Sequence, residues 1–435
     1  MGARPQERVA TLIKSVHQRD HAPTLPRAAK LFAMRLRDPA ILIAALAALA
    51  VVNASGADAI REFLDRHWRR PLAPQGPPPA RFSPLEASLQ PEACGTCHPV
   101  QLADWKSSLH AASTAPGVAG QLVEMLESDP PSALSCFTCH APLAEQAPRV
   151  DDGGRARTNP AYDAALGARG LVCAGCHVRA HQRFGPPRRD GSLAPTAPSE
   201  TLPHNGVTRA PAFLRSEFCQ SCHQFTADGF ALNGKLLENT YNEWKASRFA
   251  REGVQCQDCH MPDRRHLWRG VHDPEMVRSG VTIDASAGAS RYRPGEIVSV
   301  TLTLENTRIG HAFPTYVTPR VVLSVELVDQ AGKVVVGSRE EKVIAREVTL
   351  DLEHELSDTR LTPGAKAVLH YRRRVARPGL RARLSVAVYP DEFYTRFFES
   401  LLAQGAGRGE AQIREALAAT RRSPFTVFER EIPLT

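Results

Sequence analysis

The chain has 435 residues, of which 43% are hydrophobic, 34 are proline and 10 are cysteine, and its formal net charge is +8. This length corresponds to two or three domains, and a proline content above the usual ~5% predicts loops and short helices. The charge does not indicate nucleic-acid binding, because residues 1–38 carry five of the eight charges and residues 81–279 balance 20 Lys/Arg against 21 Asp/Glu.

The N-terminal residues predict export. Residues 1–38 form a basic tail, and Ala40–Val52 is an apolar run of 13 residues. Such a short run is more typical of a signal-peptide core than of a membrane span, which needs about 20 residues. The long basic tail instead favours an uncleaved anchor over residues 39–57, with the tail in the cytoplasm. A start at Met34 would give an ordinary signal peptide. We therefore expect the periplasmic side of the bacterial inner membrane, or a secreted periplasmic protein as the alternative.

Residues 58–84 are expected to lead from this segment into the main domains. An amphipathic helix is predicted over residues 58–70, where Ile60, Phe63 and Leu64 recur at helical spacing. The following segment, Pro71–Pro84, contains six prolines and predicts an extended stalk or strap.

All ten cysteines fall into five Cys-x-x-Cys pairs, and a histidine follows each pair directly. The cysteines are Cys94, Cys97, Cys136, Cys139, Cys173, Cys176, Cys219, Cys222, Cys256 and Cys259, and the histidines are His98, His140, His177, His223 and His260. Zinc ribbons need pairs of pairs, and neither zinc nor a disulfide framework explains the histidines. A thioredoxin-like site uses a single motif.

This spacing indicates covalently attached haem c. Two thiols can add across the two vinyl groups of one haem, and the adjacent histidine then becomes the proximal ligand of the iron. We therefore expect five covalently bound haem c groups in a domain spanning residues 85–280. Successive motifs start 42, 37, 46 and 37 residues apart, which is too little chain for five independent domains. The haems must then supply much of the core, and this domain should not fold without them.

Residues 281–435 have the pattern of an antiparallel, immunoglobulin-like β-sandwich with a helical insertion. Polar and apolar residues alternate in several segments, as in strands with one buried face. The predicted strands are residues 297–304, 320–328, 333–336, 367–375, 383–389 and 424–432, and the predicted helices are residues 393–402 and 410–421. Asp329–Gly332 is a hairpin signal between the second and third strands.

Low-spin haem irons need a second axial ligand, most often histidine in multihaem proteins. Nine further histidines lie beyond the apolar run. The candidates for the distal position are His110, His204, His266, His272 and His311, with His181 in reserve. His354 and His370 are expected to be solvated or strand-edge residues, and His67 completes the pool. Met125 and Met276 are the remaining thioether candidates.

The chain resembles the multihaem cytochromes c of the group that contains the tetrahaem cytochrome of ammonia oxidation. The resemblance spans roughly residues 85–390 and rests on Cys94–His98 followed by Trp105 and His110, and on Val254–Pro262. It implies stacked haems with two histidine ligands each, and a distal role for His110. The C-terminal part looks like the β-sandwich of larger relatives, in which the Gly-His-x-x-Pro-Thr loop recurs, here Gly310–Thr315. The fifth motif departs from the tetrahaem pattern, so the pairing of ligands is not carried over.

Electron transfer between respiratory partners is the expected function, with a redox protein or a quinone-linked donor as partner. A reductase of nitrite, hydroxylamine or tetrathionate is the alternative, and it would need one open iron position. No motif has lysine in place of histidine, and the histidine pool can close every site, so the carrier is favoured over the enzyme. A third possibility, an interaction or filament subunit whose sandwich makes protein contacts, is compatible with electron conduction.

Overall fold

The computed structural model describes residues 56–289, 292–375 and 377–434. The chain divides into two compact units, Met1–Arg61 and Glu62–Thr435. The predicted basic tail and apolar run lie outside the described residues. Within the described residues, no helix combines the length and the apolar character needed to cross a membrane.

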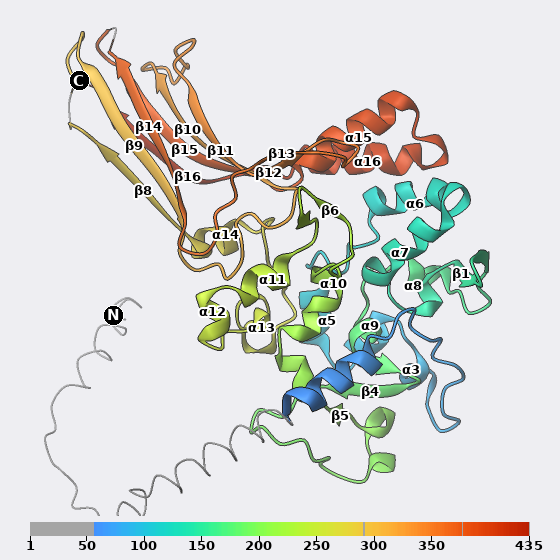
Figure 1. Ribbon diagram of the computed structural model, residues 1–435. Helices are drawn as coiled ribbons and strands as arrows, with labels where there is room; N and C mark the ends of the chain where they lie inside the picture. Colours follow the sequence, from blue (N-terminus) through green and yellow to red (C-terminus); the bar gives the residue numbers. More distant parts are fainter. Residues whose placement is uncertain (1–55, 290–291, 376, 435) are drawn as a thin grey trace, which may run out of the picture. The chain divides into compact units, whose positions relative to one another are not determined.

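The second unit begins with a region of short helices, which extends to residue 280 (Figure 1). Residues 62–67 are helical, within the predicted amphipathic helix. The α-helices that follow are α3 (Pro84–Ala87), α4 (Pro91–Gly95), α5 (Pro99–Lys106), α6 (Pro116–Ser128), α7 (Pro130–His140), α8 (Ala164–Gly167), α9 (Cys173–His177), α10 (Glu217–His223), α11 (Thr240–Lys245), α12 (Arg248–Arg251), α13 (Cys256–His260) and α14 (Pro274–Gly280). None exceeds 13 residues, and Pro occupies the first turn of many, because its fixed φ suits that position and its missing N–H is not needed there.

Small pieces of sheet connect these helices. They are β1 (Arg149–Asp152) with β2 (Arg155–Thr158), β3 (Val178–Arg179) with β4 (Gln182–Gly185) and β5 (Thr208–Arg209), and β6 (Ala231–Leu232) with β7 (Lys235–Leu236). The buried side chains of this region form several small clusters, such as those around Trp105, Leu122 and Phe213. A region of this size with only small separate cores is expected where a bound group supplies the missing apolar contacts.

The proline-rich segment Pro71–Pro84 is a strap packed on the helical region. Leu72 is buried beside Trp105 and Leu143. The backbone N–H of Gln75 donates to a carboxylate oxygen of Glu145 at 2.6 Å. Of the two predicted forms, a stalk or a strap, the structure has the strap.

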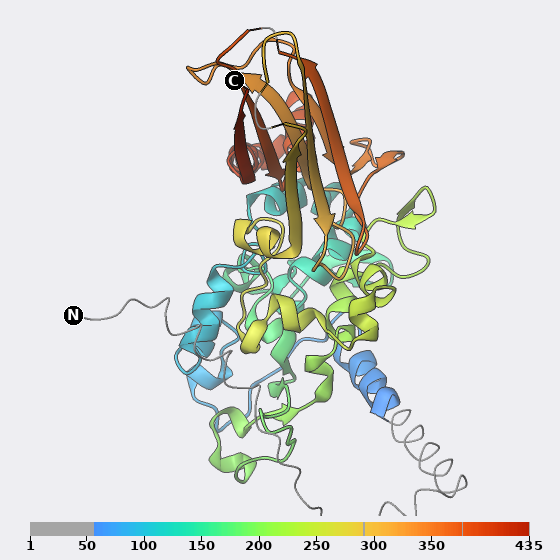
Figure 2. The ribbon, with the colours of Figure 1, turned by 90° about the vertical axis from the view of Figure 1, so that its left-hand side faces the viewer.

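The C-terminal region is a sandwich of two antiparallel sheets (Figure 2). One sheet has the order β11 (Glu340–Ile344), β10 (Arg320–Val328), β15 (Arg381–Tyr389), β16 (Phe425–Pro433), and the other has the order β14 (Lys366–Arg374), β9 (Ile297–Asn306), β8 (Val281–Ala287). Leu302 of β9 pairs with Leu369 of β14, and Val321 of β10 pairs with Val388 of β15. Alternate residues of both sheets meet in one continuous core, as the alternating sequence pattern predicts.

Most of the predicted strands are confirmed within two residues, but the one at residues 333–336 is wrong. The turn at Asp329–Gly332 does form, with the N–H of Gly332 donating to the carbonyl of Asp329 at 2.9 Å. After the turn only Val334 makes an isolated bridge, to Val328. The chain then continues to β11 before it pairs along β10. The strand β8 and the small pair β12 (Arg346–Val348) and β13 (Glu355–Asp358) were not predicted.

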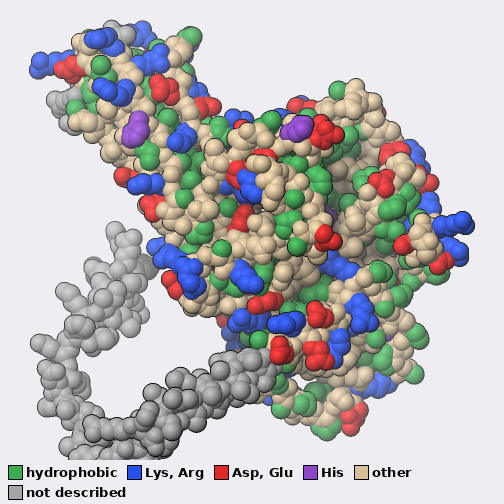
Figure 3. All heavy atoms as spheres, viewed as in Figure 1, with side chains coloured by type: hydrophobic (Ala, Val, Ile, Leu, Met, Phe, Trp, Pro, Cys, Tyr) green, Lys and Arg blue, Asp and Glu red, His purple; other side chains and the backbone are tan. Residues whose placement is uncertain are grey.

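The predicted helical insertion is confirmed as α15 (Glu392–Gln404) and α16 (Glu410–Thr420). These helices pack against α6 of the helical region. Gly120 of α6 makes this approach possible, because a Cβ there would lie 2.9 Å from Cδ1 of Ile413. On the face shown in Figure 3, acidic and basic side chains are interspersed over both regions.

Arg346 joins the sandwich to the helical region. Its side chain is 1% exposed and forms an ion pair with Glu355 at 2.8 Å. The same guanidinium donates to the backbone carbonyls of Leu232, Lys235 and Leu236 at 2.7 to 3.2 Å. The β6–β7 hairpin is thereby held to β12 and β13 by one fully buried cation.

Replacement of Arg346 by alanine should therefore lower the free energy of unfolding by about 3–5 kcal/mol, because it breaks a buried ion pair and leaves three backbone carbonyls without their donor. Arg339→Ala is the matched control, since Arg339 also pairs with a buried carboxylate, that of Glu326, but its side chain is 45% exposed. Chemical denaturation of the two variants with intact haem content measures the difference. Equal losses would contradict the assigned role of Arg346.

Candidate functional site

Each of the five motifs lies at the end of a short helix. Helices α7, α9, α10 and α13 each end at the motif histidine, and α4 contains Cys94, while His98 is the residue before α5. Residues three and four apart lie on the same side of a helix. The two thiols and the imidazole of a motif are thus presented in one direction, as attachment of one planar group requires.

The imidazoles of three motifs are oriented by backbone carbonyls. The Nδ1 atom of His140 bonds the carbonyl of Ser113 at 2.7 Å, that of His177 bonds Phe184 at 2.8 Å, and that of His260 bonds Arg269 at 2.7 Å. Because a carbonyl only accepts, Nδ1 carries the proton and Nε2 has its lone pair free. This is the arrangement of a histidine that binds a metal through Nε2.

Three of the motif histidines each face a second histidine at nearly the same separation. The ring centroids are 6.2 Å apart for His223 and His110, 6.2 Å for His177 and His266, and 6.3 Å for His260 and His311. Metal–imidazole bonds of about 2.0 Å place two rings on opposite sides of one iron with their centroids roughly 6 Å apart. The three pairs fit this geometry, so these residues fit haem iron with two axial histidines.

The second histidines differ in how their rings are held. Nδ1 of His266 bonds the carbonyl of Arg264 at 3.1 Å, and Nδ1 of His311 bonds that of Ala312 at 2.9 Å. His204 follows the same pattern, with Nδ1 bonded to the carbonyl of Gly206 at 3.0 Å. The Nδ1 of His110 is buried and has no hydrogen-bond partner in the described part of the chain.

Burial keeps several of these rings neutral. It lowers the pKa of His110 to about 3 and the pKa values of His177 and His311 to about 4. A neutral imidazole is the form that binds iron.

Three other histidines use Nε2 within the protein. Nε2 of His67 bonds the carbonyl of Cys176, that of His181 bonds Gly76, and that of His272 bonds Oδ1 of Asp391, each at 2.9 Å. Of these, His272 is a distal candidate and His181 is the reserve. The structure therefore places them differently from the three histidines that face a motif imidazole.

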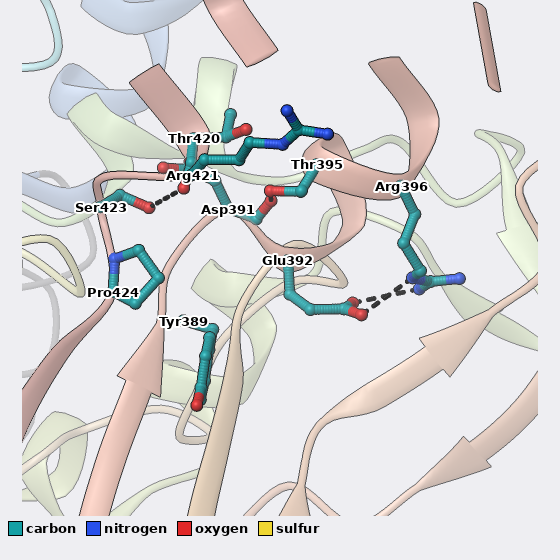
Figure 4. A pocket seen from close by; sticks show the side chains of 9 residues that line it. All are labelled: Tyr389, Asp391, Glu392, Thr395, Arg396, Thr420, Arg421, Ser423 and Pro424. Carbon is teal, nitrogen blue, oxygen red and sulfur yellow. Dashed lines mark hydrogen bonds and ion pairs between the residues drawn. The ribbon is translucent and has the colours of Figure 1, made fainter. Parts of the chain in front are cut away.

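Asp391, which bonds Nε2 of His272, lines a small hollow of about 130 Å³. Figure 4 shows Asp391 there beside Glu392, which pairs with Arg396. No motif residue lines this hollow.

Two motif histidines, His98 and His140, have no imidazole at such a ring separation among the residues that the structure describes. Burial lowers the pKa of His204, and the nearby charges of Arg183 and His98 add to the effect. His204 therefore lies near His98 and belongs to none of the three imidazole pairs. His140 has no comparable neighbour in the described ranges.

The cysteines of different motifs lie next to one another. Thiols of different motifs are close enough to affect one another: Cys173 lowers the pKa of Cys94, Cys222 lowers the pKa of Cys139, and Cys219 lowers the pKa of Cys256. Arg70 donates to the sulfurs of Cys139 at 3.3 Å and Cys222 at 2.9 Å. These proximities link the first motif with the third, and they link the fourth motif with both the second and the fifth.

Sequence reasoning did not identify the groups that orient the rings. The carbonyls of Ser113, Phe184 and Arg269 carry no side-chain signal. Trp268 contacts both His110 and His266, and its place two residues after His266 was the only hint in the sequence. Among the described residues, no cluster of three or more His, Cys, Asp or Glu could hold a metal ion.

Comparison with known proteins finds one matching family and one similar fold. The family described as cytochrome c554 and c-prime matches residues 93–165, which contain the first two motifs. A penta-heme cytochrome c552 from Thermochromatium tepidum has a similar fold, with a TM-score of 0.55 and 20% sequence identity over 81% of this chain and 100% of that chain. No curated protein sequence matches the chain significantly.

Two further structural similarities are weak, with low TM-scores. A structural genomics target named SoR45 is 9% identical over 36% of this chain and 87% of that chain, with a TM-score of 0.17. Spo0M, a sporulation control protein from Bacillus subtilis, is 10% identical over 25% of this chain and 43% of that chain, with a TM-score of 0.12. The family match, the fold and the motifs support a multihaem c-type cytochrome with covalently bound haem c.

Replacement of His110 by alanine should convert one low-spin haem to high spin, because the iron bound by His223 would lose its second imidazole. His272→Ala is the control and should leave the spin states unchanged, since Nε2 of His272 bonds Asp391. Low-temperature electron paramagnetic resonance, with haem content measured on each sample, distinguishes the two variants. An unchanged spectrum for His110→Ala would exclude it as a ligand.

Proposed function

We propose that this protein is a pentahaem c-type cytochrome that transfers electrons between respiratory partners outside the cytoplasm. The observation that carries the proposal is the set of three imidazole pairs with ring centroids 6.2 to 6.3 Å apart. Two strong-field axial histidines close an iron to substrate and suit it to electron transfer. Haem c supplies a one-electron iron couple at each such centre.

The chain's own residues would hold the haems as follows. Each motif provides two thioether bonds and one axial histidine. His110, His266 and His311 complete the centres of His223, His177 and His260, and His204 completes that of His98. The sulfur contacts between motifs support close neighbours in the order first with third, second with fourth, and fourth with fifth. The fourth centre would thus lie between the second and the fifth.

The cellular setting is part of the same proposal. Covalent haem attachment takes place on the exported side of the membrane, so we place the protein on the periplasmic side of the bacterial inner membrane, anchored or secreted. Its donor would be a redox protein or a quinone-linked enzyme, and an oligomer is compatible with this role. The resemblance to the tetrahaem cytochrome of ammonia oxidation supports the redox class.

The haem count tests the proposal. Because each motif attaches one haem, pyridine haemochrome analysis should give five haems per chain, and Cys97→Ala or Cys259→Ala should give four. Ser221→Ala is the control, since it changes a motif without removing a thiol and should keep five. An unchanged count in the cysteine variants would contradict the attachment sites.

A second candidate function is reduction of a small nitrogen or sulfur compound at the centre of His140. The supporting observation is that no imidazole of the described residues pairs with His140, which leaves one axial position for a substrate. Burial raises the pKa values of Tyr316 and Tyr394, and the Cys136 thiol is among the groups that affect both. Two protonated hydroxyls near this motif could donate protons to a bound molecule. Tyr316 is also held at φ +66°, a strained conformation that is enriched at functional sites.

This second function predicts one high-spin haem that binds hydroxylamine or nitrite in the unaltered protein. Tyr316→Phe should reduce the turnover of hydroxylamine by a factor of about 10²–10⁴, because a general acid contributes that much, while cyanide binding persists. Tyr371→Phe is the control, since its hydroxyl is buried in the sandwich core and has no hydrogen-bond partner among the described residues. Five low-spin haems that bind no cyanide would rule out the reductase.

A further inference from the structure

One aromatic side chain, Trp268, contacts the second histidines of two different centres. Its ring centroid lies 4.6 Å from that of His110, at an interplanar angle of 64°, and 5.0 Å from that of His266, at 87°. Both contacts are edge-to-face, the favourable arrangement for aromatic pairs. The indole therefore lies between the ligand paired with His223 and the ligand paired with His177.

The backbone of Trp268 also bonds a third centre. Its N–H donates to the carbonyl of His260 at 2.9 Å. The residue has φ +42°, a left-handed conformation that costs a bulky residue of order 1–3 kcal/mol and persists only where the surroundings enforce it.

The surroundings of Trp268 supply that constraint. The buried carboxylate of Asp104 accepts two hydrogen bonds from the Arg265 guanidinium, at 2.6 and 2.7 Å, and one from the backbone N–H of His266 at 2.9 Å. This anchors residues 265 and 266 to α5, directly before Trp268. Backbone strain that is enforced by such contacts indicates that the position of the Trp268 side chain has a functional role.

For His110, the indole of Trp268 takes the place of the usual hydrogen-bond acceptor. A metal-binding histidine usually donates its other N–H to an acceptor that fixes the ring plane and makes the ligand more basic. His266 and His311 have such an acceptor, but the buried Nδ1 of His110 has none among the residues that the structure describes. The edge-to-face contact with Trp268 is therefore the interaction available to fix the plane of the His110 ring.

We propose that Trp268 is a positioning residue that fixes the ring planes of His110 and His266 and thereby sets the reduction potentials of the two centres and the rate of electron transfer between them. This inference rests on the proposed electron-transfer function. The transfer moves one electron from one centre to the other, breaks no bond and needs no co-reactant. Because His110 has no acceptor at Nδ1, its centre should have the higher potential of the two.

The test replaces Trp268 by leucine and by phenylalanine in the full-length holoprotein. Trp68→Leu is the matched control, because Trp68 also packs edge-to-face on a histidine, His67, with ring centroids 5.4 Å apart, and its buried Nε1 has no partner in the described part of the chain. The readouts are the g-values of the individual low-spin signals, the potentials from a spectroelectrochemical titration, and the rate of internal electron equilibration after pulse reduction.

Trp268→Leu should shift two low-spin signals and their potentials and slow equilibration by about tenfold or more, the size of effect known for groups that orient metal ligands. Trp268→Phe should restore most of each value, and Trp68→Leu should change none. If Trp268→Leu keeps all haems and matches the unaltered protein, the proposal is overturned. Haem loss from both Trp268 variants would assign the residue a structural role and overturn it equally.

If Trp268→Leu alone loses haem, Trp268→Met is measured by the same criteria, and haem loss from it as well overturns the proposal. The outcome for Trp268 is separate from that for the proposed function. An unaltered protein that takes up no electrons would contradict electron transfer itself. An unaltered protein that equilibrates rapidly, with an unaffected Trp268→Leu variant, would remove only the role of the indole.

Discussion

The separation of two imidazole rings on opposite sides of one iron is the constraint on which the rest of the structure depends. It is met by residues far apart in sequence: His110 precedes His223 by a large part of the helical region, and His311 comes from beyond the last motif. Iron bound as proposed would therefore fix, for each pair, the relative position of two segments that are distant in the sequence. Small local cores suffice between them, because the bound groups supply the apolar contacts.

The same constraint explains why the sandwich is an integral part of the protein. His311 lies in the loop between β9 and β10, and its carbonyl accepts a bond from Asn306 at 2.9 Å. The next residue, Ala312, donates its N–H to the carboxylate of Glu243 on α11 at 3.1 Å. The sandwich thus provides a rigid base for the proposed ligand His311, while Arg346 and the contact of α16 with α6 add further contacts between the sandwich and the helical region. A loop alone would place that imidazole far less accurately.

Local features of the fold could be predicted from the sequence, whereas long-range pairings could not. Alternation of polar and apolar residues located β10 with its observed bounds, Arg320–Val328, and the motif spacing predicts the attachment residues. The prediction of a strand at residues 333–336 was wrong because the turn at Asp329–Gly332 indicates only where the chain reverses direction. Continuous pairing with β10 begins later, at β11. No local pattern relates His223 to His110, or His272 to Asp391, which is 119 residues away. These pairings depend on packing between segments, which spacing does not encode.

The location of the iron atoms in the holoprotein tests the central claim most directly. Anomalous diffraction from crystals at the iron absorption edge gives those positions without reference to the protein coordinates. The account predicts iron midway between His110 and His223, between His177 and His266, and between His260 and His311, and iron beside His140 without a histidine opposite. Iron bound to any of these motif histidines with a different residue on its far side would contradict the assigned pairs.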